Sequence, residues 1–246
     1  MDPISGQQSK LIKRLSLKKY RNSEGLFVAE GKKLLEELLA QSAFRLRHVF
    51  ISEPLQQVFK EQLNAVPHSV HSEKEIAKYS QLRTSPGIIA IVEIPTNQKA
   101  FVPGWTLVLD EISDPGNMGS LIRTAEWFGV KNIWCNANCV DIFNHKVVQS
   151  AMGSLFRLCP VFYSPEVLKE KLETSQLPIF KAEMHGQNAF EMTFPEEGFL
   201  MMGSESHGIS STFKDLGNSV TIPGKGRAES LNVVVAAGVL ASRLNT

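Results

Sequence analysis

Residues 106–129 read TLVLDEISDPGNMGSLIRTAEWFG. The run at residues 106–110 is short and apolar and is followed by turn residues, which is typical of a buried strand. Over residues 119–128 apolar side chains recur at helical spacing, and Gly129 is a natural helix stop. A strand, a turn and a helix in this order indicate the first repeat of an α/β fold.

The same alternation of strand and helix extends in both directions from this stretch. Downstream, strands are expected at residues 106–110, 132–135, 161–163, 179–183, 199–203 and 220–222, and helices at 119–128, 145–158, 165–175, 210–216 and 230–244. Upstream, strands are expected at 26–29, 48–52, 69–71 and 88–94, and helices at 31–41, 55–64 and 73–80. The alternation in the downstream series predicts a mostly parallel sheet with helices on both faces. Ligands bind such sheets at the carboxyl ends of strands, which directs attention to the segments after Asp110, Gly203 and Ile222.

A proline- and glycine-containing stretch separates the two series. Residues 95–104 read PTNQKAFVPG, and two prolines, a glycine and polar residues are typical of a linker. The sequence therefore predicts an N-terminal domain over residues 1–95, a linker over 96–104 and a C-terminal domain over 105–246.

The composition excludes several classes of protein. Of 246 residues, 43% are hydrophobic and 21% are charged with a net charge of +1, so disorder is excluded as the dominant state. Three cysteines are too few for a disulfide scaffold and favour a reducing, cytoplasmic location. The longest apolar run, residues 233–241, falls short of the ~20 residues that span a membrane. The N-terminal segment lacks the pattern of a signal peptide.

The first 50 residues carry a net charge of +5. At helical spacing one face of the predicted basic helix carries four cations, Lys10, Arg14, Lys18 and Arg21. Such a face suits a polyanion such as RNA. A merely solvated helix face is the alternative, and charge alone favours it.

The loop after Asp110 contains Asp-Pro-Gly-Asn at residues 114–117, which predicts a tight turn. Arg123 follows one turn into the next helix, near the positive end of the helix dipole, where a guanidinium is poorly placed without an anion. Either a bound anion or a salt bridge to Glu126 or Asp114 satisfies this requirement.

The loop after the strand at 199–203 resembles the nucleophile elbow of a serine hydrolase, with Ser204, Ser206 and Gly208 at alternate positions. That architecture needs a histidine well after the serine, and the last histidine of the chain is its neighbour His207. The order of residues therefore argues against an acyl hydrolase.

The loop after Ile222 contains Gly224 and Gly226, which permit close backbone approach to a ligand. It lacks the third glycine of a dinucleotide-binding fingerprint and the pattern of a Walker A loop. Ser230 is the expected N-cap of the next helix, and Asn232 takes part either in a core hydrogen bond or in a ligand contact. Cys135, Cys139, Asp141 and His145 fit no common zinc pattern, so no metal is expected.

Together, in order and wording, these loops resemble the three motifs of the SpoU family of RNA ribose methyltransferases, within the knotted SPOUT superfamily. The matching stretches are Asp114-Pro115-x-Asn117-x-Gly119-x-x-x-Arg123-Thr124-Ala125, then Gly203-x-Glu205-x-x-Gly208, and then Ile222-Pro223 with Ser230-Leu231-Asn232-Val233. The segment Lys18-x-x-Arg21-x-x-x-Gly25-x-Phe27-x-x-Glu30-Gly31 is similar to the substrate-binding domain that many of these enzymes carry.

The resemblance implies a parallel-sheet SPOUT domain with a C-terminal trefoil knot, a smaller N-terminal α/β domain of the L30e-like ribosomal-protein type, and a homodimer. It implies catalytic or orienting roles for Arg123, Asn117, Glu205, Ser230 and Asn232. It implies binding of the cofactor S-adenosylmethionine by Met202, Gly203, Glu205, Gly208, Ile222, Gly224, Ser230 and Leu231. Because a guanidinium stays protonated, phosphate positioning is the safer role for Arg123.

The sequence therefore predicts an S-adenosylmethionine-dependent 2′-O-methyltransferase that acts on structured RNA, with ribosomal RNA favoured. A transfer RNA methyltransferase and a non-catalytic RNA-binding protein that keeps the fold are the alternatives. No membrane and no metal are expected as partners.

Overall fold

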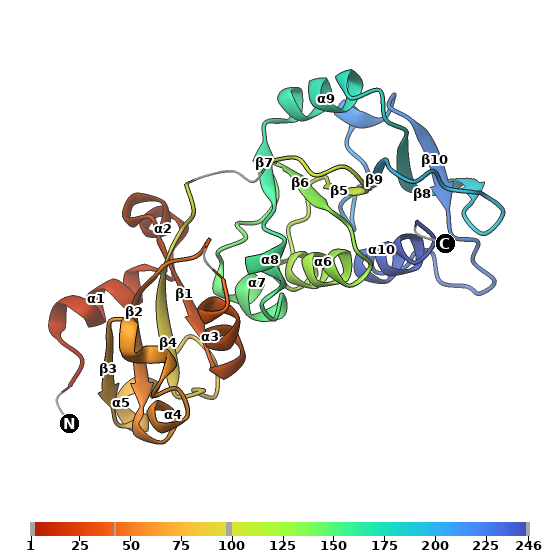
Figure 1. The fold of residues 1–246 in the computed structure, drawn as a ribbon. Helices are drawn as coiled ribbons and strands as arrows, with labels where there is room; N and C mark the ends of the chain where they lie inside the picture. The colour runs from red at the N-terminus through yellow and green to blue at the C-terminus, as the bar shows by residue number, and fades with distance from the viewer. Residues whose placement is uncertain (1–2, 42, 97–99, 245–246) are drawn as a thin grey trace. The chain divides into compact units, whose positions relative to one another are not determined.

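The computed structural model describes residues 3–41, 43–96 and 100–244, which form two compact units (Figure 1). The first unit comprises residues 3–96 together with residues 143–156. The second comprises residues 100–142 and 157–244. Each unit has its own sheet, so each is described separately.

The sheet of the first unit is mixed. Its four strands are β1 (Leu26–Glu30), β2 (Leu46–Ser52), β3 (His68–His71) and β4 (Ile88–Glu93), in the order β1-β4-β2-β3. β4 runs antiparallel to both of its neighbours, and only β2 and β3 are parallel. All four strands were predicted. The sequence predicted an α/β domain here without a strand direction, and the sheet is mixed because β4 enters its middle in the opposite direction.

Helices pack around this mixed sheet. They are α1 (Gly6–Arg14), α2 (Lys18–Glu24), α3 (Lys32–Leu39), α4 (Glu53–Val58) and α5 (Glu73–Ala77), with a 3₁₀ turn η1 (Gln62–Ala65). Apolar residues of α1, α5 and the strands, among them Ile12, Ile76 and Phe50, form a common core. The predicted helix at 55–64 is divided into α4 and η1.

A segment from the middle of the chain belongs to this first unit. The ring of Phe143 lies 4.8 Å from that of Phe27, and the ring of Phe156 lies 5.1 Å from that of Phe44. The predicted single helix at 145–158 is two helices, α7 (His145–Ser150) and α8 (Ser154–Arg157), because Met152 and Gly153 adopt left-handed backbone angles. The sequence assigned this segment to the C-terminal domain, whereas aromatic packing places it with the first sheet.

Two histidines of the first unit predict a loss of stability in mild acid. Burial lowers the pKa of His48, with the nearby His68 and His71 adding to the effect. Burial also lowers the pKa of His145, together with the charges of Lys146 and Arg21. Near the ordinary histidine pKa of ~6.5 the unfolded chain therefore binds more protons than the folded chain.

We accordingly expect the melting temperature to fall as pH drops from about 7.5 to about 5.5. The double variant His48→Gln/His145→Gln lacks both titrating groups, so its thermal melts should depend less on pH over this range. An equally steep dependence in the double variant would contradict this assignment.

The second unit is built on a sheet in which every pairing is parallel. Its strands are β5 (Thr106–Leu109), β6 (Asn132–Asn136), β7 (Val161–Tyr163), β8 (Ile179–Asn188), β9 (Phe199–Met202) and β10 (Asn218–Thr221). Their order is β10-β8-β9-β5-β6-β7. The parallel α/β sheet predicted here is confirmed, and the carboxyl ends of β5, β9 and β10 share one edge.

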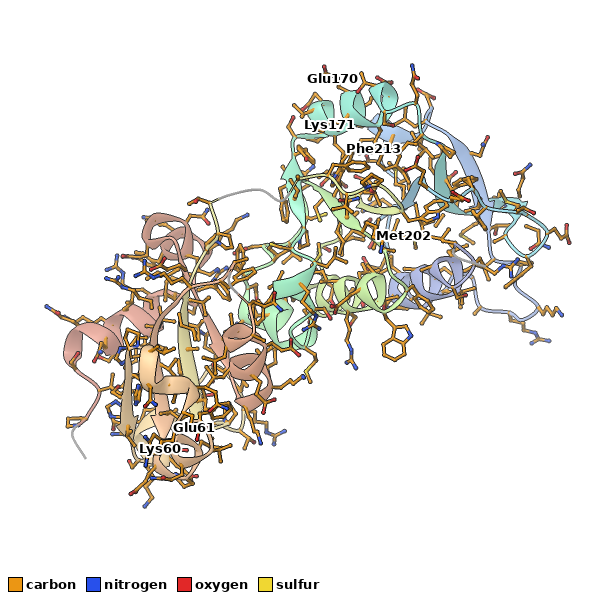
Figure 2. All side chains as sticks on the ribbon, in the orientation of Figure 1. Lys60, Glu61, Glu170, Lys171, Met202 and Phe213 are labelled. Carbon is orange, nitrogen blue, oxygen red and sulfur yellow. The ribbon has the colours of Figure 1, made fainter. Side chains whose placement is uncertain are left out.

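Helices α6 (Pro115–Trp127), α9 (Pro165–Thr174) and α10 (Val233–Ala241) cover this sheet (Figure 1). The core that α9 covers includes Leu168, Phe199 and Phe213, and Figure 2 shows Phe213 beneath α9. The helix predicted at 210–216 is only a short 3₁₀ turn, η2 (Ser211–Phe213). None of the described helices combines the length and the hydrophobicity that a membrane-spanning segment requires.

Candidate functional site

The first loop ends in a capped helix. The side chain of Asp114 accepts a hydrogen bond from the backbone N–H of Asn117 at 2.7 Å, and Pro115 occupies the first helical position. The tight turn predicted at 114–117 is therefore wrong, since these residues form the N-cap and first turn of α6. This capping places the side chain of Asn117 at the N-terminus of α6, beside the carboxyl end of β5.

Asn117 joins all three predicted loops. Its Nδ2 donates a close hydrogen bond to Oε1 of Glu205 in the second loop. Its Oδ1 accepts a hydrogen bond of 3.2 Å from Nδ2 of Asn232 at the end of the third loop. These partners are 88 and 115 residues away along the chain. The structure therefore brings Asn117, Glu205 and Asn232 together at the edge where the sequence placed the ligand.

The second loop is closed upon itself. Ser204 and Gly208 exchange two backbone hydrogen bonds of 3.0 and 2.9 Å. A Cβ on Gly203 would overlap the backbone of Gly208, and Gly208 itself has a left-handed φ of +67°. Met202 is buried at the end of β9, where Figure 2 labels it. Glycine is thus required at 203 by space and favoured at 208 by conformation.

The hydrolase alternative finds no support in this loop. Ser206 is exposed, and among the described residues its hydroxyl makes no hydrogen bond. The backbone N–H of His207 donates to Oγ of Ser204 at 3.2 Å, which is a local turn contact. A nucleophile paired with a base is therefore absent from this part of the described structure.

The third loop is largely exposed and reaches the other two through Asn232. The expected N-cap at Ser230 is wrong, because the side chain of Asn232 accepts from the backbone N–H of Val234 at 2.8 Å and caps α10. Ser230 is exposed two residues earlier and is not brought into this contact. Ile222 is partly exposed, and Leu231 is 50% exposed. Exposed apolar side chains beside a polar cluster are suited to a ligand with both kinds of surface.

Arg123 is exposed on α6, six residues after Asn117 and therefore ~9 Å further along the helix axis. Within the described residues its guanidinium makes no hydrogen bond or ion pair. The predicted salt-bridge partner Glu126 instead forms a two-point ion pair with Arg157. An unpaired arginine near a cluster of polar loops is free to bind an anion from outside the chain.

Comparison with known proteins decides the family. The family model of the SpoU rRNA methylases matches residues 104–242, which is more than half of the chain. The chain belongs to the SpoU rRNA methylase family. The model of the MRM3-like substrate-binding domain matches residues 7–90.

Several relatives match this SpoU chain over nearly its full length. A Synechocystis protein described as an uncharacterised tRNA/rRNA methyltransferase is 32% identical over 96% of this chain and 91% of its own. A 23S rRNA guanosine 2′-O-methyltransferase of Bacillus subtilis is 26% identical over 99% of this chain and 98% of its own. A solved TrmH-family structure from Porphyromonas gingivalis has a TM-score of 0.87 at 31% identity, covering 99% of both chains.

The fold also matches the Streptomyces viridochromogenes SpoU methyltransferase AviRb, solved with the cofactor AdoMet. That structure has a TM-score of 0.87 at 22% identity and covers 98% of this chain and 97% of its own.

The residues of this chain suit a nucleoside cofactor of the SpoU kind. The space where a Cβ would project from Gly208 or Gly224 is open, so these backbones are accessible to a ligand. Leu231 offers an exposed apolar surface, and Glu205 offers an exposed carboxylate. Among the described residues no group of three or more His, Cys, Asp or Glu side chains could hold a metal ion.

Two polar residues at the ends of strands were not predicted as part of the site. Asp110 and Asn136 are both almost completely buried, and Nδ2 of Asn136 donates a close hydrogen bond to Oδ1 of Asp110. Burial is the main cause that raises the pKa of Asp110. In the sequence, a polar residue at the end of each of two apolar strands could have indicated this pair.

The predicted basic face is divided between two helices. Lys10 and Arg14 lie on α1, and Lys18 begins α2. Arg14 is half-exposed, lies over the ring of Tyr20 at 4.2 Å and approaches Glu24 at 3.7 Å. Lys10 and Lys18 are exposed. These cations remain candidates for RNA contact.

Arg21 has to be removed from the four residues predicted to bind RNA. It is 3% exposed, and its Nη1 donates to the carbonyl oxygens of Leu15 at 2.9 Å and Ser16 at 2.8 Å, which lie just past the end of α1. These carbonyls lack helical partners, so the guanidinium satisfies backbone groups rather than a ligand.

The contrast between Arg21 and Lys18 gives a prediction. We expect Lys10→Gln/Lys18→Gln to leave the melting temperature unchanged and to weaken RNA binding. The slope of the logarithm of the binding constant against the logarithm of the salt concentration should become less steep by ~0.7 for each phosphate that the variant no longer binds. Arg21→Gln should instead lower the melting temperature, because buried carbonyls lose their donor. Thermal melts and RNA titrations at several salt concentrations measure both. Unchanged RNA affinity in the double lysine variant would move the RNA-binding surface elsewhere.

Proposed function

We propose that this protein transfers a methyl group from S-adenosylmethionine to a ribose 2′-hydroxyl of ribosomal RNA. The observation that carries the proposal is the contact of Asn117 with both Glu205 and Asn232. Three loops that are remote in sequence meet there at the carboxyl edge of a parallel sheet, where α/β proteins bind ligands. The 23S rRNA 2′-O-methyltransferase of Bacillus subtilis matches 99% of this chain and supports ribosomal RNA as the acceptor.

In the proposed reaction the 2′-oxygen attacks the methyl carbon, the carbon–sulfur bond breaks with its electrons passing to sulfur, and the hydroxyl proton passes to solvent. Bound S-adenosylmethionine supplies the electrophilic methyl on a sulfonium centre. The task of the chain is to orient the hydroxyl in line with that methyl. Because the departing thioether is neutral, the reaction needs no metal to stabilise a leaving group.

Residues of the three loops divide this work. Arg123 is exposed and unpaired among the described residues, so it is suited to hold the phosphate next to the reacting ribose. Asn117 and Asn232 fix the loops that present donor and acceptor to each other. We assign the contacts with the cofactor to Gly203, Gly208, Gly224 and Leu231, together with Ser230, Ile222 and Met202. The first unit, through Lys10, Arg14 and Lys18, binds the RNA.

Methyl transfer with the purified protein tests this function. Ribosomal and transfer RNA from cells that lack the protein are incubated with radiolabelled S-adenosylmethionine and then hydrolysed with alkali. Because a 2′-O-methyl group blocks hydrolysis of the adjacent phosphodiester, the label should appear in an alkali-resistant dinucleotide from ribosomal RNA.

Three other results contradict parts of the proposal. Label in transfer RNA alone would favour the transfer RNA alternative, and label in mononucleotides would indicate a methylated base. RNA binding without any label would favour a non-catalytic RNA-binding protein.

The proposed enzyme is a homodimer formed through α6 and α10. These helices pack side by side, with Cγ2 of Thr124 3.7 Å from the Cβ position of Gly238 (Figure 1). Their outer surface exposes Trp127 by 82% and Val235 by 51%. Large apolar side chains exposed on two packed helices favour a covered surface, and a second copy of the chain supplies an identical one.

A charge at this surface tests the dimer. Trp127→Glu should convert the dimer to a monomer in sedimentation analysis, because a dimer must bury the carboxylate in an apolar contact. Met184→Glu is the matched control, since Met184 is also exposed but lies on β8. Equal effects of both variants, or a monomeric wild type, would contradict this interface.

The trefoil knot, the L30e-like character of the first unit and a cytoplasmic location are also part of the proposal. The return of α10 to pack on α6, the first helix of the second unit, supports the knot. The match of residues 7–90 to a substrate-binding domain supports the second point. The three cysteines, Cys135, Cys139 and Cys159, are few and odd in number, which supports a reducing compartment.

A further inference from the structure

Asp110 is a buried carboxylate that the proposed reaction does not use. It follows β5 directly and is 0% exposed. Its Oδ2 accepts a hydrogen bond from the backbone N–H of Ser210 at 2.7 Å, and its Oδ1 accepts from Asn136. Burial raises the pKa of Asp110, these hydrogen bonds lower it, and the neighbouring Glu111 raises it. Burying a carboxylate is costly, so its hydrogen bonds must compensate locally.

The contacts of Asp110 lie at both ends of the second loop. Its backbone N–H donates to the carbonyl oxygen of Met202 at 2.9 Å, just before the loop begins. Its side chain holds Ser210, just after the loop ends. Between these anchors the Ser204–Gly208 hydrogen bonds close the loop, and Glu205 reaches Asn117.

We infer that Asp110 is a positioning residue that fixes the entry and exit of residues 203–209 and thereby holds Glu205 and Gly208 where the methyl donor binds. The inference rests on the proposed function, because it takes this loop as part of the donor site. Asn136 ties the same carboxylate to the end of β6, so three strand ends share one anchor.

Asp110→Asn is a sharp test because the two side chains have the same shape. The carboxylate accepts hydrogen bonds on both of its oxygens, whereas an amide accepts on one side and donates on the other. The NH₂ of the new amide must therefore face one of the two donors. If the new NH₂ faces Ser210, it opposes a backbone N–H. If it faces Asn136, it opposes an amide whose oxygen already accepts from the backbone N–H of Asn138 at 2.9 Å. One hydrogen bond is lost either way.

Ser210→Pro removes the same hydrogen bond from the other side. The φ of Ser210 is −62°, which is the angle that proline imposes, so the substitution suits the backbone and deletes the N–H donor. The ring Cδ that replaces the N–H also displaces Oδ2 of Asp110, so this contact is lost completely. Ser210→Ala keeps the backbone donor and loses only the hydroxyl. Glu30→Gln is the matched control, because Glu30 is a buried, hydrogen-bonded carboxylate with a raised pKa in the first unit.

Two measurements on the full chain, well below its melting temperature, separate positioning from general stability. Calorimetry gives the affinity for S-adenosylmethionine, and hydrogen exchange without ligand gives the protection of residues 203–209. We expect Asp110→Asn and Ser210→Pro to weaken the affinity about 10- to 100-fold, as loss of a hydrogen bond to a charged group predicts, and to speed exchange in this loop. Ser210→Ala should have a smaller effect, and Glu30→Gln should change neither.

The outcomes separate the inference from the function on which it rests. Wild-type affinity and exchange in a folded Asp110→Asn or Ser210→Pro variant would overturn the inference. Weakening by Glu30→Gln to the same extent would also overturn it, because the effect would then be one of stability. If the wild type does not bind S-adenosylmethionine, the proposed function fails, while faster exchange of the loop in the two variants still identifies the anchor. If Asp110→Asn does not fold, Ser210→Pro carries the test.

Discussion

Arg123→Ala should reduce methyl transfer about 100-fold or more while leaving the affinity for S-adenosylmethionine nearly unchanged. The guanidinium makes no hydrogen bond or ion pair with the described part of its own chain, so its removal costs none. The effect is therefore expected to appear only where an external phosphate must be held. Single-turnover methylation and calorimetric titration with the donor measure the two quantities separately.

Arg123→Lys distinguishes charge from geometry. A lysine retains the positive charge but lacks the planar, two-pronged donor arrangement that matches a phosphate. We expect Arg123→Lys to recover part of the methyl-transfer rate that Arg123→Ala loses. Its rate should depend less strongly than that of the wild type on which acceptor RNA is supplied. An Arg123→Ala enzyme with the wild-type rate would refute the role given to this residue, and loss of donor affinity would place Arg123 on the cofactor side instead.

Gly203→Ala should damage both the fold of the second loop and cofactor binding. The new Cβ would overlap the backbone carbon and oxygen of Gly208, and backbone cannot rotate away as a flexible side chain can. The Ser204–Gly208 hydrogen bonds would have to open. Overpacking of this kind costs about 2 kcal/mol, which corresponds to a melting temperature lower by about 4–8 °C in a chain of this size.

Gly224→Ala is the matched control for space. No atom of the described chain lies within 4 Å of the Cβ position of Gly224, and its φ is not left-handed. Its melting temperature should equal that of the wild type, whereas its donor affinity should fall if a cofactor lies against this backbone. Equal melting temperatures for Gly203→Ala and the wild type would show that the loop is not closed as described.

The sequence predicted the features that depend on local pattern. All six strands of the second unit were placed from short apolar runs between turn residues, and the sites after Asp110 and Gly203 followed from the parallel arrangement. The starts of α6 at Asp114 and of α10 at Asn232 were not predicted correctly. Both residue types favour turns and N-caps alike, so the pattern alone does not choose between a tight turn and a capped first turn.

Features that depend on long-range packing were not predicted. Residues 143–156 join the first unit through Phe143 and Phe156, and helical periodicity does not identify which sheet such rings contact. Arg21 shares the spacing of exposed cations, and only the fold shows that it satisfies carbonyls beyond α1. Asp110 bonds to a backbone group 100 residues away, which no local pattern records.

Hydrogen exchange of the whole chain with and without S-adenosylmethionine tests the central claim most directly. If the three loops form one donor site, the ligand should slow exchange together in residues 114–119, 203–210 and 222–232, and leave the sheet of the first unit unchanged. Protection confined to one of these loops, or protection elsewhere in the chain, would contradict a shared site.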